Sequence, residues 1–316
     1  MKYIETFREG EKIAGVYLCK SKSSAVTKNG KPYESAILQD KTGMVDAKIW
    51  EPSSQGIDDF DALDYVDIVA DVIVFNGVTQ LNVKRIRKVR EGEYDPRDYL
   101  PVSEKDIDKM FEELKKYIEA VKDKHLNLLL NKIFIEDKEF AESFKVHSAA
   151  KSVHHGFIGG LLEHTLSVVK LCSFYTTLYP MLNRDLLISA AMLHDIGKVE
   201  EIEAFPVNDY TDDGNLLGHI VMGSEKTGRI ADTIEGFPRQ LKSQLQHCIL
   251  AHHGQLEYGS PKKPALIEAL ALCYADDTDA KLETMKEMLS NAGYQDSGKW
   301  VGYNKRLETN VRRTEW

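Results

Sequence analysis

The sequence predicts a two-domain protein in which a small all-β domain is followed by an all-α domain. Three observations support this prediction. Residues 1–90 contain short runs of strand character, residues 91–102 hold two prolines and several charges, and apolar residues then recur at helical spacing. A chain of 316 residues is long enough to bury a separate core in each domain.

The first 90 residues contain five strand-like runs separated by turn signals. Asn76-Gly77 lies between the last two runs and is a strong signal for a hairpin. Five strands at this spacing predict a small barrel or sandwich. The runs are Lys12–Lys20, Tyr33–Asp40, Met44–Trp50, Tyr65–Phe75 and Val78–Val89.

The remainder of the chain is predicted to be helical. Ser103 and Asp106 resemble a helix N-cap with an acidic first turn, so residues 91–145 are interpreted as a linker with connecting helices. The main helical domain is expected over 146–290, and residues 291–316 form a tail without clear periodicity. The clearest helices are Leu161–Tyr175, Asp185–Ile196, His219–Ile234, Arg239–His252 and Pro264–Leu289.

Composition argues against a membrane protein and against a secreted, disulfide-bonded protein. No apolar run reaches the length of a membrane span, and residues 1–11 lack a secretory signal. The four cysteines are far apart and form no CxxC pair, so we expect reduced thiols in a cytoplasmic protein. The net charge of −9 argues mildly against nucleic acid, but residues 1–90 carry 14 Lys and Arg against 13 Asp and Glu.

Histidines and aspartates in the helical region predict a metal centre. Imidazole and carboxylate ligands without thiolate suit Mn²⁺, Fe²⁺, Co²⁺ or Zn²⁺ better than Mg²⁺. A carboxylate such as that of Asp195 could bridge two ions, an arrangement suited to displacement at phosphorus. Ligands on several helices would meet inside a bundle. The candidates are His164, His194, Asp195, His219, His252, His253 and Asp276.

Extended motifs around these residues resemble the HD phosphohydrolase superfamily. The matching strings are HHGFIGGLLEHTLSVV, LHDIGK, GHI and AHHG, with Asp276 in ALCYADDTDAK. With a small barrel in front, the whole chain is similar to the YhaM-type 3′→5′ exoribonucleases. The resemblance implies an OB-fold domain over 1–90 and an HD domain over 146–290.

The resemblance also implies roles for the candidate ligands. His164, His194, Asp195 and Asp276 would hold a first divalent ion. A second would be held by His219, His252 and His253 with Asp195 bridging, unless one of the adjacent pair His252 and His253 contacts substrate instead. Mn²⁺ is favoured, with Fe²⁺, Co²⁺, Zn²⁺ and Mg²⁺ as alternatives. Asp277 and Asp279 are weaker candidates, for which a solvated or supporting role is favoured.

Three residues are candidates for direct catalytic roles. Asp195 is the first, as a metal ligand. Lys198 could meet a phosphate oxygen, or could simply be a cation near a helix C-terminus. His155, with His154, could contact the scissile phosphate or donate a proton to the leaving 3′-oxygen, or be an ordinary loop residue.

Aromatic and basic residues in the β domain are candidates for nucleic-acid binding. Bases could stack on Tyr17, Tyr33, Trp50 or Phe75, although at least two of these rings are expected in the core. A basic run could follow a phosphate backbone or be a solvated strand edge. This run consists of Lys84, Arg85, Arg87, Lys88 and Arg90.

The leading functional hypothesis is a metal-dependent 3′→5′ exoribonuclease that converts single-stranded RNA, and possibly DNA, to 5′-nucleoside monophosphates. One alternative is a phosphodiesterase or phosphatase for small or cyclic nucleotides, and another is a non-catalytic RNA-binding scaffold. The aromatic tail makes a homo-oligomer plausible. Cleavage of an oligonucleotide but not of free nucleotides would separate the first two hypotheses, and metal content would separate both from the third.

Overall fold

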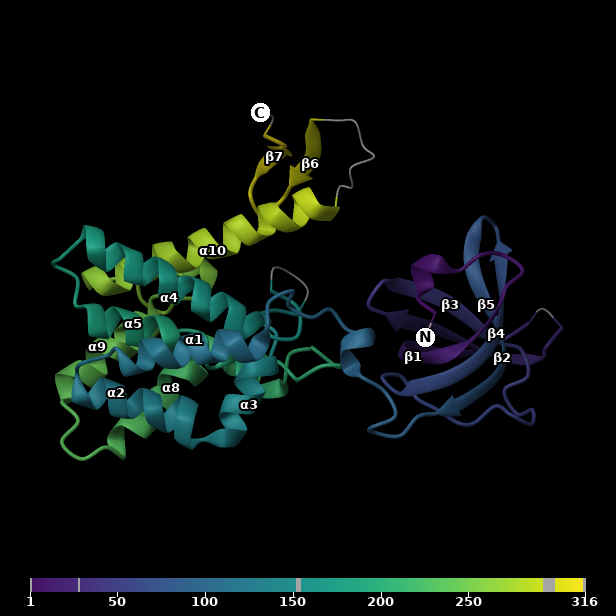
Figure 1. Cartoon of the computed structure of the whole chain (residues 1–316), viewed down its shortest axis with the longest axis horizontal. Coiled ribbons are helices and arrows are strands. Elements are labelled where there is room, and N and C mark those ends of the chain that lie inside the picture. Colours follow the sequence, from purple (N-terminus) through teal and green to yellow (C-terminus); the bar gives the residue numbers. More distant parts are fainter. Residues whose placement is uncertain (1, 28, 152–154, 292–298, 315–316) are drawn as a thin grey trace. The chain divides into compact units, whose positions relative to one another are not determined.

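The computed structural model describes residues 2–27, 29–151, 155–291 and 299–314. The chain divides into two compact units, Met1–Pro101 and Val102–Trp316 (Figure 1). Each unit has its own cluster of buried apolar side chains, and the two clusters have no residue in common. The units are therefore described one at a time.

The first unit is a closed five-stranded barrel in which the strand order is β1-β2-β3-β5-β4. Neighbouring strands are antiparallel except β3 and β5, which are parallel. This closed five-stranded arrangement confirms the predicted OB-fold class. The strands are β1 (Lys12–Val26), β2 (Pro32–Asp40), β3 (Gly43–Ile49), β4 (Tyr65–Phe75) and β5 (Val78–Lys88).

The interior of the barrel follows from alternation along the strands. In β4, Val66, Ile68, Ala70 and Val72 are buried, whereas the intervening side chains are partly exposed. Successive side chains of a strand point to opposite faces, so these alternate residues fill the interior of the barrel.

Residues after β5 continue to pack on the barrel. Tyr94 stacks on Tyr65 with ring centroids 3.6 Å apart, and Tyr99 meets Tyr65 edge-on at 5.1 Å. The Gln39 side-chain amide donates to the carbonyl of Tyr99 at 3.0 Å. The short 3₁₀ helix η2 (Pro96–Asp98) lies within this segment, so the compact unit extends beyond residue 90 to Pro101.

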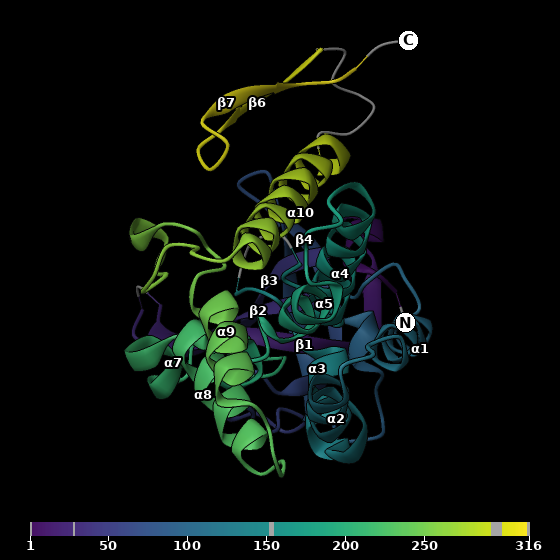
Figure 2. The ribbon, with the colours of Figure 1, turned by 90° about the vertical axis from the view of Figure 1, so that its left-hand side faces the viewer.

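The second unit is a helical bundle with α4 and α5 at its centre (Figures 1 and 2). Both are buried over most of their surface, and α4 packs against α1, α3, α5 and α10. The predicted helices of the main domain are present as α4, α5, α8, α9 and α10. The helices are α1 (Ile107–Glu119), α2 (Lys124–Asn131), α3 (Lys138–Val146), α4 (Gly160–Leu178), α5 (Arg184–Leu193), α6 (Lys198–Glu201), α7 (Asp212–Leu217), α8 (His219–Asp232), α9 (Arg239–Leu250) and α10 (Ile267–Asn291), with a π-helical turn, η3 (Lys132–Glu136), after α2.

The described part of the C-terminal tail is a β-hairpin, β6 (Trp300–Asn304) and β7 (Thr309–Arg312). Val311 is buried, and the Asn304 side-chain amide lies 3.0 Å from the sulfur of Met288 on α10. These residues form a regular hairpin although their sequence shows no clear periodicity. None of the helices within the described ranges is long and apolar enough to cross a membrane.

Candidate metal centre

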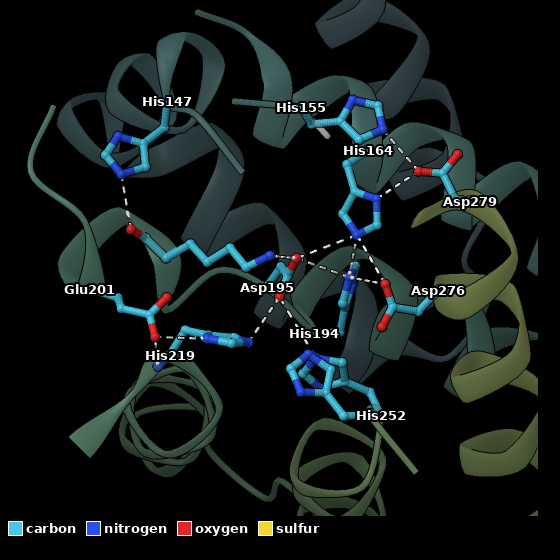
Figure 3. A network of polar contacts seen from close by, with 12 residues as sticks. His147, His155, His164, His194, Asp195, Glu201, His219, His252, Asp276 and Asp279 are labelled. Atoms are coloured by element: carbon cyan, nitrogen blue, oxygen red, sulfur yellow. Dashed lines mark hydrogen bonds and ion pairs between the residues drawn. The ribbon is translucent and has the colours of Figure 1, made fainter. Parts of the chain in front are cut away.

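Side chains from five helical segments converge on one buried cluster in the second unit (Figure 3). His164 lies in the first turns of α4, and Asp276 lies in α10. The remaining members occupy helix ends: His194 and Asp195 follow α5, His219 opens α8, and His252 follows α9. His164, His194, Asp195 and His252 are almost completely inaccessible to solvent.

A close backbone contact holds the end of α5 against the start of α8. A Cβ atom on Gly197 would lie 2.1 Å from the carbonyl oxygen of His219 and 2.7 Å from the amide nitrogen of Gly223. Only glycine fits at this contact. The approach places His219, at the start of α8, beside Asp195, in the turn that follows α5.

The carboxylate of Asp195 lies between two groups of imidazoles. Its Oδ2 atom is 3.3 Å from Nε2 of His194 and 3.4 Å from Nε2 of His164. Its Oδ1 atom faces the other way, 3.4 Å from Nε2 of His219 and 3.7 Å from Nε2 of His252. One carboxylate thus offers an oxygen to each group.

Two further ligand candidates complete the groups. Asp276 places Oδ1 3.1 Å from Nε2 of His164, so it lies on the Oδ2 side of Asp195. The ring of His253 lies 4.2 Å from that of His252 and 5.3 Å from that of His219, measured between centroids. His219, His252 and His253 can bring one ligand atom each close together, as can His164, His194 and Asp276.

The imidazoles share one orientation. In each, Nδ1 lies 2.7–2.9 Å from a carbonyl or carboxylate oxygen. Such oxygens only accept hydrogen bonds, so Nδ1 carries a proton and Nε2 is the atom that each ring can offer to a metal. Histidine ligands are commonly oriented in this way by an outer hydrogen bond. The pairs are His164 with Asp279, His194 with Ala191, His219 with Glu201, His252 with Ile249 and His253 with Tyr258.

Unsatisfied atoms point toward the middle of the cluster. Asp195 Oδ1, His219 Nε2 and His252 Nε2 are buried and have no hydrogen-bond partner within the described ranges. Each buried polar group that is left unpaired lowers the stability of the fold by about 1–3 kcal/mol. A cation would satisfy all three acceptors, so these residues fit a divalent metal with nitrogen and oxygen ligands.

The charge balance of the cluster favours a cation. Burial opposes charge on His164, but Asp195, Asp276 and Asp279 outweigh it and raise the pKa of His164 well above its usual value. Burial instead lowers the pKa of His252 well below its usual value, which keeps that ring neutral. The centre therefore combines a neutral ligand with a carboxylate-rich side that attracts positive charge.

Two residues without a predicted role support the centre from behind. Glu201 accepts from Nδ1 of His219 at 2.9 Å and from its backbone amide at 3.0 Å. His147 donates from Nε2 to the carbonyl of Lys198 at 2.9 Å. No motif in the sequence marks either of the two.

The predicted catalytic residues lie at different distances from the ligand cluster. Lys198 places Nζ 2.7 Å from Asp195 Oδ2 and is therefore at the centre itself. His155 is buried and donates from Nε2 to Asp279 at 3.0 Å, so it lies behind His164. Asp279 acts as a supporting carboxylate, while Asp277 is exposed and pairs with Lys281. His154 lies outside the described residues.

The aromatic candidates of the barrel divide unequally. Tyr17 is fully buried and donates its hydroxyl to the carbonyl of Lys2, so its predicted stacking role is wrong. Trp50 is 44% exposed and its ring lies 5.1 Å from that of Tyr33. Phe75 is also exposed and Tyr33 is only half-buried, so one ring of the four lies in the core and the expectation of at least two is wrong.

Most of the basic run on β5 takes part in ion pairs with nearby acids. Lys84 lies 3.7 Å from Asp71, and Lys88 lies 2.8 Å from Asp64. Arg87 pairs with Asp67 at 3.5 Å and with Glu93 at 3.0 Å. Arg85 lies beside Gly56, and Arg90 follows the strand. Exposed ion pairs are weak, so each of these pairs contributes little to the stability of the barrel.

Comparison with known proteins agrees with this geometry. A model of the HD domain matches residues 161–281, a range that contains all the candidate ligands. The HD family is metal-dependent, which supports the binding of a divalent metal by this chain. The second OB-fold domain of replication protein A from Methanococcus maripaludis covers 27% of this chain and 88% of its own, at 18% identity. Its TM-score of 0.20 carries no weight, so the barrel is assigned from its strand order.

Similarity over the full length is much stronger. The chain is 34% identical over 294 residues to the 3′-5′ exoribonuclease YhaM of Bacillus pumilus (strain SAFR-032). The match covers 92% of this chain and 91% of that protein, and so includes both the barrel and the helical unit. The chain belongs to the YhaM family of 3′-5′ exoribonucleases.

Proposed function

We propose that this chain is a metal-dependent 3′→5′ exoribonuclease that hydrolyses single-stranded RNA to 5′-nucleoside monophosphates. The observation that carries the proposal is the position of Asp195, whose two oxygens face two separate groups of buried ligands. The similarity to YhaM supports the reaction and its direction. The four cysteines are free, which supports action in the cytoplasm.

The centre is proposed to hold two ions, with Mn²⁺ favoured. When bound, such a pair would lower the pKa of a water and offset the charge that develops at phosphorus. The first ion would be held by His164, His194, Asp195 and Asp276, and the second by Asp195, His219, His252 and His253.

The residues of the chain itself have distinct proposed tasks. Lys198 is 15% exposed at its side chain, so its ammonium can leave Asp195 Oδ2 for a phosphate oxygen. The segment before it is fixed through its backbone contact with α8, which limits movement of Asp195. His155 is proposed to position His164 through their shared acceptor Asp279 rather than to meet substrate.

The barrel is proposed to hold the RNA. Tyr33 and Trp50 form a pair of neighbouring rings on which bases can stack, and such stacking tolerates any sequence. Lys84, Arg85 and Arg87 would exchange their acidic neighbours for phosphates.

The test is hydrolysis of a 5′-labelled single-stranded RNA with Mn²⁺, with and without chelator, followed as a product ladder. We expect shortening from the 3′ end that chelator and Asp195→Asn both abolish. Intact RNA together with hydrolysis of small or cyclic nucleotides would replace the exonuclease proposal with the phosphodiesterase alternative. Intact RNA and no bound metal would contradict both.

A further inference from the structure

The C-terminal hairpin has one face toward α10 and one toward solvent. Val311 and Asn304 belong to the inner face, where Val311 is buried and Asn304 contacts Met288. A β-bulge between Trp300 and Gly302 inserts one extra residue into β6. The outer face is formed by Trp300, Tyr303, Asn310 and Arg312.

The bulge is what brings the two aromatic residues together. In a regular strand, residues three apart point to opposite faces. Here Trp300 pairs with Arg312 and Tyr303 pairs with Asn310, and these two partners share a face of β7. Both rings are consequently exposed, Trp300 to 62% and Tyr303 to 59%. A local irregularity has thus re-aimed a ring toward solvent rather than toward α10.

The outer face also carries positive charge. The Arg312 guanidinium lies 6.0 Å from the centroid of the Trp300 ring, within the range of a cation–π contact. Residues 299–314 contain five Lys and Arg and one acid; of these cations Arg312 belongs to the outer face, whereas Arg313 turns inward and donates to the carbonyl of Leu289. Exposed rings combined with cations match a single-stranded nucleic acid, which offers bases to stack and phosphates to neutralise.

We propose that the outer face of the C-terminal hairpin is a second binding surface for single-stranded RNA, with bases stacked on Trp300 and Tyr303. This inference rests on the ribonuclease function proposed above. The hairpin contacts α10 near Met288 and Leu289, and α10 also carries Asp276 of the metal centre. Thirteen residues of α-helix span about 20 Å.

That separation sets a length requirement for the RNA. Stacked nucleotides advance about 3.4 Å each, so roughly six are needed to reach from the metal centre to the hairpin. Substrates shorter than this would be processed without the hairpin, and longer ones would gain affinity from it. A protein partner is the less favoured occupant, because the family acts on RNA and the ring of Trp300 lies beside the cation Arg312.

The experiment compares the full chain with its W300A/Y303A variant. Binding of a labelled 20-nucleotide RNA is measured by fluorescence anisotropy, with metal present and with Asp195→Asn in both proteins to prevent turnover. Steady-state hydrolysis of 4- and 20-nucleotide RNAs is measured in the otherwise unchanged chain. The control is Tyr179→Ala, which removes a ring of similar exposure (53%) at the end of α4.

We expect the double variant to raise Kd and KM for the 20-mer about tenfold or more, because one stacked base contributes about tenfold in affinity. Hydrolysis of the 4-mer should stay within about twofold. W300F/Y303F should recover most of the affinity, since phenylalanine retains a stacking face. Tyr179→Ala should behave as the unaltered chain.

Each contrary outcome identifies what failed. Unchanged 20-mer binding in the double variant would overturn the hairpin surface while leaving the ribonuclease proposal intact. Equal losses on both RNA lengths, or an altered mass by light scattering, would overturn it in favour of a folding or self-association role. RNA that is bound through the hairpin but never hydrolysed would contradict the proposed function and not the surface.

Discussion

At the scale of single residues, each metal-facing imidazole depends on a group behind it. Glu201 and Asp279 are the two carboxylates that serve this purpose, for His219 and His164 respectively. Removing such a partner typically lowers metal affinity or activity 10–100-fold. Both acids have a close neighbour in sequence that is exposed, which offers matched controls.

Asp279→Asn is expected to reduce metal affinity and RNA hydrolysis about 10–100-fold, because both His155 and His164 donate to the same oxygen of Asp279. Despite burial, these bonds lower the pKa of Asp279 below its usual range, so it is an ionised acceptor at neutral pH. The measurement is metal titration followed by kinetics. Asp277→Asn should be neutral, and a comparable loss there would contradict the assignment.

Glu201→Gln is expected to weaken the His219 side of the centre by a similar factor. The amide can still accept a hydrogen bond from Nδ1, but it no longer supplies a negative charge near the ring. Bound metal per chain, measured by elemental analysis after dialysis, checks this. Glu200→Gln alters an exposed residue paired with Lys226 and should keep full occupancy. Equal metal content in the two variants would refute the role of Glu201.

The sequence could predict the ligands and named Asp279 as a candidate support, but it did not mark Glu201. His164, His194, Asp195 and Asp276 lie in motifs whose order and spacing are recognisable, and the structure brings them within contact distance. Glu201 is adjacent to Glu200 in a run of acids, and only tertiary packing determines which of the two turns inward.

At the scale of elements, the contact between Gly197 and α8 aligns the two halves of the ligand set. Gly197→Ala would place a methyl group 2.1 Å from the His219 carbonyl, so the turn and α8 must separate. We expect the free energy of unfolding to fall by about 1–3 kcal/mol or more, and the rate of hydrolysis to fall more than 100-fold. Denaturant unfolding and kinetics test this.

Gly43→Ala is the control for that substitution. At Gly43 the nearest atom to an added Cβ is a methyl carbon of Ile4 at an ordinary 3.9 Å. Its stability should change by less than about 0.5 kcal/mol. If Gly197→Ala changed the free energy of unfolding as little as Gly43→Ala, the backbone contact could accommodate a methyl group and would not fix the position of Asp195.

Predictability differed among elements for physical reasons. Helices α4, α5, α8, α9 and α10 have long apolar patterns, so their existence was evident and only their ends differed. The hairpin was missed because its bulge breaks the alternation that identifies a strand. The number of buried rings among Tyr17, Tyr33, Trp50 and Phe75 was overestimated, because composition does not reveal which strand positions face outward.

At the scale of the whole molecule, the two units bury separate cores, and ligand binding to one need not stabilise the other. A metal that binds only the folded helical unit stabilises it by about 2.7 kcal/mol at a hundredfold excess over Kd. We expect added Mn²⁺ to slow hydrogen exchange in α4, α5 and α10 while exchange in β1–β5 stays unchanged. Equal protection of both units would show that they unfold together.

Removing residues 1–101 is expected to separate binding from chemistry. The helical unit retains its own core and every candidate ligand, so hydrolysis of a small chromogenic diester should stay within about twofold. KM for a 20-nucleotide RNA should rise at least tenfold, because each lost stacking contact contributes about 1–3 kcal/mol. Parallel losses on both substrates would contradict this division of labour.

The separation of the two apolar cores also determines which activity remains when one unit is damaged. Damage to the interior of the barrel has no shared side chain through which to disturb the packing around Asp195. A chain whose barrel is unfolded would therefore keep an active helical unit. It would be a hydrolase that still cleaves small substrates but holds long RNA weakly. The apolar strands that such a barrel exposes are the kind of surface by which proteases and chaperones recognise damaged chains.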